Sequence, residues 1–127
     1  MSTAQDSQGR RIAVVLFNLG GPDGPDSVKP FLFNLFNDRL ISGRREKSAQ
    51  ANYDYMGGGS PLLPGTRAQA GALEQALSDR LPADDIKAFI CMRYWHPMTE
   101  AVAAEVEAWA PDEIVLLPLY PQFSTTT

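Results

Sequence analysis

Arg93, Tyr94, Trp95 and His96 follow one another in the sequence and bring four different chemistries to one place. They supply a fixed cation, a phenol, an indole and an imidazole. Such a cluster can bind a flat anionic aromatic ligand, because a guanidinium holds carboxylate through paired hydrogen bonds and aromatic rings cover an apolar face. The alternative is that Arg93 pairs with a structural carboxylate while Tyr94 and Trp95 fill the core. A lone histidine before Pro97 indicates a helix cap rather than a ligand.

Three glycines at 57–59, followed by Ser60, form a second candidate site. Consecutive glycines can turn their amides toward an anion, as backbone nests do, and Ser60 adds a hydroxyl. Contact with a carboxylate or phosphate is one interpretation, and a flexible linker is the other. The basic residues Arg44, Arg45 and Lys47 are typical of a solvated surface unless a site lies beside them.

A third group of glycines, at positions 20, 21 and 24, follows an apolar run. It does not match the G-x-G-x-x-G dinucleotide fingerprint, because position 22 is proline, and it lacks the Lys-Ser/Thr ending of a P-loop. A tight turn from a strand into a helix is therefore favoured over a nucleotide site.

The composition, 127 residues with 44% apolar and 20% charged side chains, is that of one small folded domain. A net charge of -4 offers no electrostatic footprint for nucleic acid, which is not expected as a partner. The single cysteine, Cys91, cannot by itself form a disulfide, a structural zinc site or a typical iron–sulfur cluster, and this favours a reducing compartment, the cytoplasm. Residues 1–11 lack the apolar core of a secretory signal, and no apolar run approaches the roughly 20 residues that cross a bilayer.

The elements that must position these groups are short apolar strands that alternate with amphipathic helices. The expected strands are 12–17, 86–92 and 114–117, and the expected helices begin at Ser27, Thr66 and His96-Pro97. This order predicts an α/β fold, a three-layer open parallel sheet with helices on both faces. Ligands of such sheets bind beyond the carboxyl ends of the strands, here at 18–22, 93–97 and 120–123.

Three local expectations follow from residue types. Ser27 is expected to cap the first helix, which places Pro30 at the third helical position, where a missing N–H loses no partner. Residues 42–60 are expected to form one helical turn and then a loop. The second helix is expected to bury a stripe and to end at Pro82. That stripe consists of Ala70, Leu73, Leu77 and Leu81.

Five segments, taken together, resemble ferrochelatase in their order and approximate spacing. They are Asn18–Pro22, the helix from Phe31 to Asp38, Gly57–Pro61, Met92–Glu100 and Tyr120–Ser124. No segment is decisive alone, but their joint occurrence is highly specific. The resemblance covers the chain from about residue 11 to its end.

The resemblance implies insertion of Fe²⁺ into protoporphyrin IX to make protohaem, the closing step of haem synthesis, with loss of two pyrrole protons. It also implies a fold of two similar α/β halves around a porphyrin cleft. Residues 11–127 look like an incomplete amino-terminal half, and residues 1–10 like a flexible terminus. Protoporphyrin IX and ferrous iron would be the substrates, with no cofactor and no iron–sulfur cluster.

The resemblance carries residue roles over to seven positions, which fit a large apolar disc that bears two carboxylates. Leu19 would face the macrocycle, Arg45, Tyr53 and Ser60 would line its propionate and lip side, Arg93 and Tyr94 would sit on the floor near the ring, and Tyr120 would follow from the third strand.

Two departures from the family pattern matter. The family carries its proton-accepting histidine and partner glutamate in the second half, so neither a catalytic residue nor a metal ligand is expected in this chain, and His96 is not that histidine. Between Ile41 and Ser42 the family has a longer apolar segment, part of the porphyrin lip and of a membrane-facing surface. We therefore expect a fragment or a deletion variant that supplies porphyrin contacts, is inactive alone, and self-associates or is poorly stable. A peripheral membrane contact is expected only of the full-length protein.

Three other functions remain open at the level of sequence. The chain could be a non-catalytic porphyrin- or haem-binding module, since the cluster at Arg93 needs no base to hold a ligand. It could be a nucleotide-binding α/β domain, against which the glycine pattern argues. It could also be a chelatase for cobalt or for another tetrapyrrole, because a fold does not select the metal.

Overall fold

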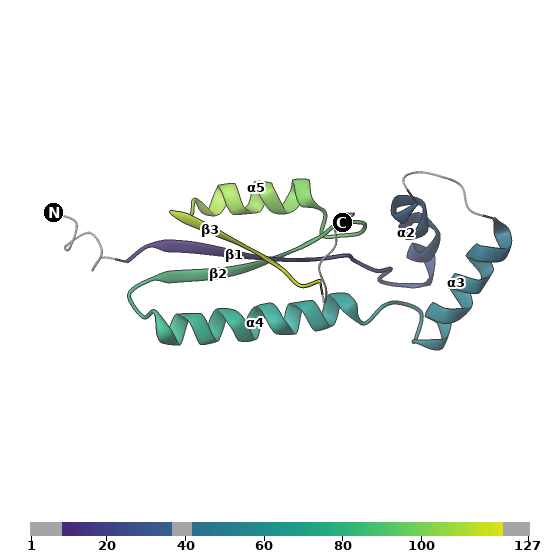
Figure 1. Cartoon of the computed structure of the whole chain (residues 1–127), viewed down its shortest axis with the longest axis horizontal. Coiled ribbons are helices and arrows are strands. Elements are labelled where there is room, and N and C mark those ends of the chain that lie inside the picture. Colours follow the sequence, from purple (N-terminus) through teal and green to yellow (C-terminus); the bar gives the residue numbers. More distant parts are fainter. Residues whose placement is uncertain (1–8, 37–41, 121–127) are drawn as a thin grey trace.

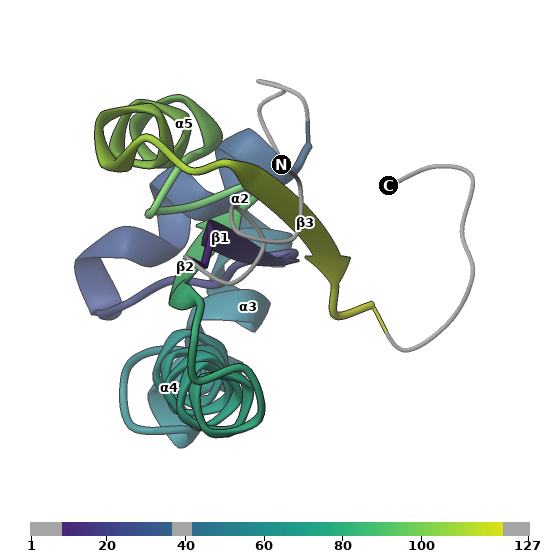
Figure 2. The ribbon, with the colours of Figure 1, turned by 90° about the vertical axis from the view of Figure 1, so that its left-hand side faces the viewer.

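The computed structural model describes residues 9–36 and 42–120. Three strands, β1 (Arg11–Asn18), β2 (Asp85–Met92) and β3 (Glu113–Pro118), form a parallel sheet in the order β2-β1-β3. A long helix, α4, covers one face of the sheet and a shorter helix, α5, covers the other (Figures 1 and 2). The predicted three-layer α/β fold with a parallel sheet is confirmed.

The central strand β1 is apolar on both sides because helices cover both of its faces. Ala13 and Val15 pack in the cluster under α5, whereas Val14 and Leu16 pack in the cluster under α4. Because successive side chains point to opposite faces of the strand, one continuous apolar run contributes residues to two separate cores. The strand predicted at 12–17 is found with one further residue at each end.

Helix α4 (Leu62–Arg80) begins four residues before the predicted start at Thr66. Pro61 is its N-cap residue, and Pro64 lies in the first turn, where the backbone N–H groups have no intrahelical partner. Thr66 is buried, and its hydroxyl donates to the carbonyl of Leu62 at 2.7 Å. The predicted stripe is confirmed at three of its positions, while Leu81 lies past the helix and is exposed.

Helix α5 (Thr99–Trp109) begins at Thr99, after the predicted start. Met98 is its N-cap residue, so the expected capping role of His96 is wrong. The His96-Pro97 peptide is cis, and the carbonyl of Pro97 accepts a 2.8 Å hydrogen bond from the amide of Met92. A turn therefore intervenes between β2 and α5.

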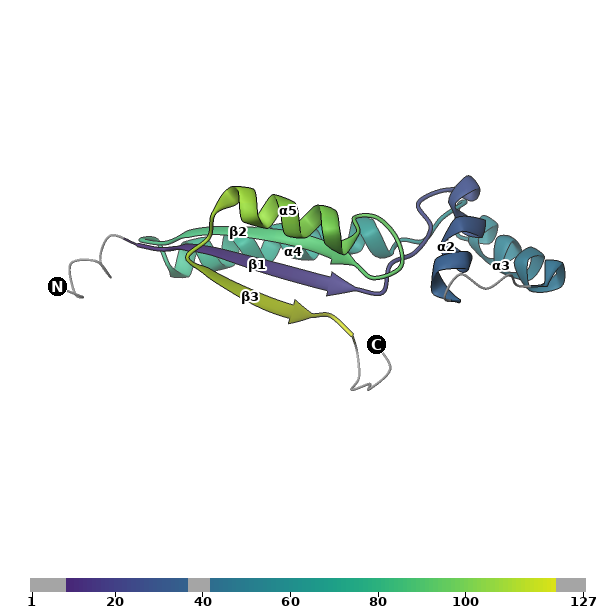
Figure 3. The same cartoon turned by 90° about the horizontal axis from the view of Figure 1, so that it is seen from above.

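A 3-10 turn, η1 (Pro25–Ser27), and helices α2 (Val28–Leu35) and α3 (Gly43–Tyr55) lie beyond the carboxyl end of the sheet (Figures 1 and 3). Helix α2 buries its apolar stripe in a cluster of Val28, Phe31 and Leu32. Ser27 precedes α2, but its side chain caps nothing there, and the hydroxyl donates instead to the carboxylate of Asp23.

Helix α3 runs for 13 residues where the sequence predicted one helical turn. It contains no fully buried residue, so it lacks the apolar periodicity that marks a helix in sequence. The side chain of Ser42 caps it by accepting a 3.3 Å hydrogen bond from the amide of Arg45.

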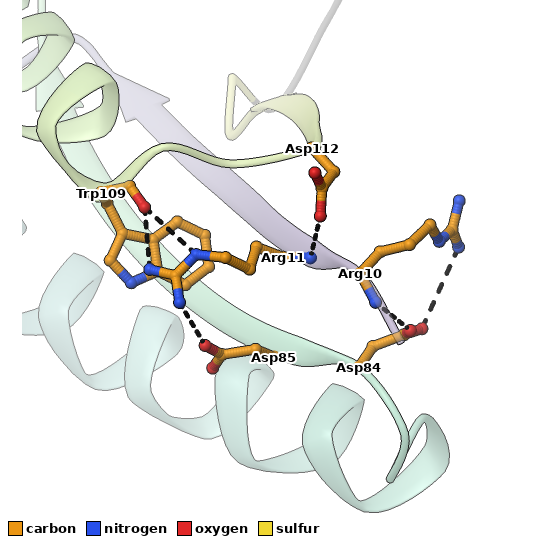
Figure 4. A network of polar contacts seen from close by, with 6 residues as sticks. All are labelled: Arg10, Arg11, Asp84, Asp85, Trp109 and Asp112. Carbon is orange, nitrogen blue, oxygen red and sulfur yellow. Dashed lines mark hydrogen bonds and ion pairs between the residues drawn. The ribbon is translucent and has the colours of Figure 1, made fainter. Parts of the chain in front are cut away.

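The amino ends of all three strands meet in a polar network, the N-terminal clasp, made of Arg10, Arg11, Asp84, Asp85, Trp109 and Asp112 (Figure 4). The guanidinium of Arg11 donates twice to the carbonyl of Trp109, at 2.8 and 3.2 Å, and once to Asp85 at 3.0 Å. Its central carbon lies 4.2 Å from the centroid of the Trp109 ring system. The amides of Arg10 and Arg11 donate to Asp84 and Asp112. The clasp fixes the strand starts at the end of the sheet opposite α2 and α3.

The two edge strands, β2 and β3, differ in what covers them. On β2, the amide of Ala88 donates a 2.7 Å hydrogen bond to the carboxylate of Glu74 on α4. On β3, the side chains of Ile114 and Leu116 are 53% and 66% exposed. Among the helices that the structure describes, none has the length and apolar character to cross a membrane.

Candidate functional site

The first two strand exits meet, as the sequence predicted. The amide of Arg93 donates to the carbonyl of Asn18 at 3.1 Å, and the amide of Tyr94 donates to the carbonyl of Leu19 at 3.0 Å. The side-chain amide of Asn34 on α2 donates to the carbonyl of Tyr94 at 3.1 Å. The loop after β2 is thereby held against both the turn after β1 and helix α2.

Arg93 and Tyr94 form a pair. Nε of Arg93 donates a 2.9 Å hydrogen bond to the Tyr94 hydroxyl, and the guanidinium carbon lies 5.0 Å from the centroid of the phenol ring. This hydrogen bond raises the pKa of Arg93 above its ordinary value, so the side chain is a fixed cation. In residues 9–36 and 42–120 no carboxylate lies within ion-pair distance of Arg93, so the alternative of a structural salt bridge is not supported there.

A cavity of about 750 Å³ lies between α5 and the sheet, a size typical of small-molecule sites. Its walls are mostly apolar and include Phe17, Val102 and Leu116. Arg93 and Tyr120 line the same cavity, and the Tyr120 ring contacts Phe17 edge to face, with 6.4 Å between the ring centroids. The cavity runs along α5 to Ala110 and Pro111 near the start of β3, and Arg93 and Tyr120 border it at the carboxyl ends of the strands.

Tyr94 does not line this cavity but packs on the buried cluster of α2, which Tyr53 also contacts. The ring of Tyr53 meets Phe31 edge to face, with 6.4 Å between the centroids. Burial raises the pKa of Tyr53, so its hydroxyl stays protonated as a hydrogen-bond donor. The Arg93–Tyr94 pair thus connects the cavity to the α2 cluster that carries Tyr53.

Arg45, Ser60 and Leu19 do not line the cavity. Arg45 is exposed on α3, with its guanidinium carbon 5.9 Å from the Phe36 ring centroid. Leu19 is half-buried, and its observed contact with the pair is through its backbone carbonyl. The structure therefore brings Arg93, Tyr94, Tyr53 and Tyr120 into one connected region and leaves the other three predicted residues around it.

The glycine run does not form a nest of free amides. The amides of Gly57, Gly58 and Ser60 donate to the carbonyls of Asp54, Tyr53 and Pro22. The Ser60 hydroxyl oxygen accepts from the amide of Leu62 at 3.1 Å, and within the part of the chain that the structure describes the hydroxyl proton has no acceptor. Three of the four amides thus already have backbone acceptors, which argues against an anion-binding nest.

The same segment closes the first glycine turn. A Cβ added to Gly21 would lie 2.6 Å from the Cβ of Ser60, and one added to Gly59 would lie 3.0 Å from the carbonyl oxygen of Pro22. Glycine is required at these positions because two backbones approach closely. The turn is thus packed by the chain itself, which argues further against a phosphate-binding loop.

Asp23 was missed by sequence reasoning. Its carboxylate accepts a 3.1 Å hydrogen bond from the indole of Trp95 and another from the hydroxyl of Ser27. The bond from Ser27, followed by that from Trp95, holds the pKa of Asp23 below its ordinary value. Asp23 and Trp95 are 72 residues apart, so no spacing in the sequence could have joined them.

The described residues contain no group of three or more histidine, cysteine, aspartate or glutamate side chains that could hold a metal ion. His96 is exposed, and its ring contacts Trp95 with 4.9 Å between the centroids. Cys91 is buried, and its sulfur lies 3.4 Å from the Thr99 hydroxyl.

Comparison with known proteins adds an independent observation. The family model named ferrochelatase matches residues 11–127. A ferrochelatase of Caulobacter vibrioides is 61% identical over 133 residues, which cover 93% of this chain and 38% of that protein. A ferrochelatase of Phenylobacterium zucineum is 60% identical over 92% of this chain and 38% of its own length, and one from a Wolbachia of Drosophila simulans is 48% identical over 91% and 41%.

The chain thus spans about two-fifths of the length of these relatives. The stretch aligned with the Caulobacter protein is longer than the 127 residues of this chain. That relative therefore carries residues inside the stretch that have no counterpart here, in agreement with a shortened internal segment. The predicted place of the shortening, between Ile41 and Ser42, borders residues 37–41, which lie outside the described ranges.

Proposed function

The chain belongs to the ferrochelatase family, and on that premise we propose that it supplies porphyrin contacts to a protein that inserts ferrous iron into protoporphyrin IX, forming protohaem in haem synthesis. The observation that carries this proposal is the Arg93–Tyr94 pair at the border of an apolar cavity. A porphyrin is a large apolar disc with two carboxylates, and the cavity offers it a cation, the phenol of Tyr120 and an apolar wall, while the phenol of Tyr94 is hydrogen-bonded to that cation.

In this proposal Arg93, Tyr94 and Tyr120 meet the macrocycle, and Leu19 faces it from the turn after β1. Within residues 9–36 and 42–120, four of the five N–H donors of the Arg93 guanidinium remain after its bond to Tyr94. The groups proposed for the propionate side are Arg45, Tyr53 and Ser60, which together offer one exposed cation and two hydroxyl donors.

The chain is proposed to be inactive by itself. Metal insertion displaces two pyrrole protons, which a positioned base must accept. The sequence has one histidine, His96, and it lies exposed against Trp95 rather than in the cavity lining. Iron is a substrate in this scheme, with no resident metal and no iron–sulfur cluster. Cytoplasmic location, self-association, and peripheral membrane contact of a longer protein stay predictions.

The second candidate is a non-catalytic porphyrin-binding module, which the same cavity favours because binding needs no base. Titration of the chain with protoporphyrin IX tests what the two proposals share, and we expect a saturable shift of the Soret band. Addition of Fe²⁺ or Zn²⁺ to the complex should then give no metalloporphyrin above the uncatalysed rate. Clear turnover by the chain alone would contradict our account of the base.

Nucleotide binding is the outcome that would overturn both candidates. A flat Soret response, together with thermal stabilisation of the chain by ATP or NAD, would indicate it. A variant with Arg93→Leu should lose the Soret shift, whereas Arg80→Leu, which removes an exposed cation at the far end of α4, should keep it.

A further inference from the structure

Trp95 anchors the loop that carries the Arg93–Tyr94 pair. Its indole N–H donates a 3.1 Å hydrogen bond to Oδ1 of Asp23 in the turn after β1, and the hydroxyl of Ser27 donates to the same oxygen. Gly20 lies below the loop with φ +98, and a Cβ there would be 3.2 Å from the amide nitrogen of Trp95. Because Gly20 has no side chain, the loop after β2 can pack directly on the turn after β1.

We propose that Asp23 is a positioning residue, which holds the Arg93–Tyr94 pair at the border of the cavity by anchoring the indole of Trp95. The inference rests on the proposed function, because the placement of the pair matters only where a ligand meets it.

The backbone contacts of the loop explain why a bond at Trp95 reaches Arg93. The amides of Arg93 and Tyr94 are docked on Asn18 and Leu19, so the loop is already held on its β1 side. Trp95 follows directly, and both Trp95 and Tyr94 pack on the α2 cluster. Loss of the bond between the indole and Asp23 releases the backbone that follows Tyr94. This matters for Arg93 because the Tyr94 hydroxyl accepts its hydrogen bond.

The ionised carboxylate of Asp23 is a suitable group for holding the indole of Trp95 in place. Because hydrogen bonds lower the pKa of Asp23, it is a carboxylate at neutral pH, and a charged acceptor makes a stronger bond to the indole than a neutral one. Asp23 is exposed and Trp95 half-buried, so the bond adds little to the stability of the whole fold. Its effect is concentrated on the position of the loop.

The test compares four forms of the chain with the wild type. Asp23→Ala removes the acceptor, Trp95→Phe removes the donor but keeps a ring, and Asp23→Asn retains a side-chain oxygen in the same place. Asp26→Ala is the matched control, because it deletes another exposed carboxylate in the adjacent η1 turn. The readout that needs no ligand is the rate at which the Arg93 Nε–H exchanges with water, followed by NMR.

We expect exchange of the Arg93 Nε–H to become about tenfold faster in Asp23→Ala and in Trp95→Phe, the effect of losing one hydrogen bond to a charged group. Asp23→Asn should stay within about twofold of the wild type, and Asp26→Ala should not change. Affinity for protoporphyrin IX should fall by a similar factor, about tenfold, in the first two variants, with the thermal unfolding midpoint little changed.

Two results separate this inference from the proposed function. If the Arg93 Nε–H stays protected in both Asp23→Ala and Trp95→Phe, Asp23 does not position the pair and the inference is overturned. If protection is lost in both while the wild-type chain binds no porphyrin, the positioning role of Asp23 is supported and the proposed function fails.

Discussion

Nε of Arg93 donates a 2.9 Å hydrogen bond to the hydroxyl of Tyr94, the next residue in the chain. Successive side chains of a strand point to opposite faces, so neighbours can meet in this way only after the strand has ended. Strand β2 ends at Met92, and the pair occupies the first two positions beyond it. The Arg93–Tyr94 pair, on which the proposed function depends, can therefore form because β2 ends at Met92.

The first prediction concerns the guanidinium itself. Arg93→Lys keeps the positive charge but loses the planar fork, including the Nε donor. We expect affinity for protoporphyrin IX to fall about tenfold, measured by Soret titration. Arg80→Lys should leave the affinity unchanged, and equal affinities for Arg93→Lys and wild type would show that charge alone matters at position 93.

The second prediction concerns the N-terminal clasp. Arg11→Met keeps an apolar stem for contact with Trp109 but removes the hydrogen bonds to Trp109 and Asp85. Because the site is partly exposed, we expect the free energy of unfolding to fall by about 1–2 kcal/mol in urea denaturation. Porphyrin affinity should be retained, since Arg93 and Tyr120 follow the carboxyl ends of the strands and the clasp joins their amino ends. A loss of affinity with unchanged stability would contradict this separation.

The third prediction concerns the first glycine turn. Gly21→Ala places a Cβ 2.6 Å from the Cβ of Ser60, so the two segments must separate. We expect a loss of about 1–3 kcal/mol in the free energy of unfolding. Gly24→Ala is the control, because a Cβ there meets nothing within 4 Å, and it should cost much less. Equal costs at the two positions would show that close packing against Ser60 is not the cause.

The fourth prediction concerns pH. The folded-state pKa of Asp23 lies below the ordinary 3.8, so folding favours the ionised form. The stabilisation is present in full above pH 3.8 and is lost as the pH falls through the lower folded-state pKa. The small destabilisation caused by Asp23→Ala should therefore be greater at pH 7 than at pH 3, measured by urea denaturation. A difference that grows toward low pH would have the wrong sign.

The fifth prediction concerns the β2 edge. Glu74→Ala leaves the amide of Ala88 without its 2.7 Å acceptor and uncovers a backbone donor on an edge strand. We expect a loss of about 1 kcal/mol in stability and a larger associated fraction in light scattering. Glu74→Gln keeps an acceptor oxygen and should behave like the wild type. Identical scattering from all three forms would exclude a protective role for this carboxylate.

The sheet and its two covering helices were predictable because their apolar patterns are strong. Residues 12–17 form an uninterrupted apolar run, which a strand between two helix layers requires. Helix α3 was not predictable, since its contacts are few and no side chain in it is fully buried. The start of α4 was misplaced at Thr66, whereas the helix begins at Leu62 and accepts Pro64 in its first turn.

The candidate site was predictable only in part. The grouping of Arg93 with Tyr94 follows from their adjacency after a strand, and the strand order then brings Tyr120 to the same cavity. The anchor at Asp23 depends on a turn and a loop that lie far apart in sequence. The glycine run misled because the amides of Gly57 and Gly58 find partners at the end of α3, and that of Ser60 in the turn after β1, which cannot be read from composition.

Because the two edges of the sheet differ, a further strand is expected at one edge and not at the other. On β2 a side chain of α4 already occupies a backbone donor, whereas on β3 apolar side chains stand uncovered. A strand that joins this sheet, whether from a longer form of the same polypeptide or from a neighbouring copy, is thus directed to the flank of β3. Extension on that side would turn β3 into an interior strand with both of its backbone edges paired.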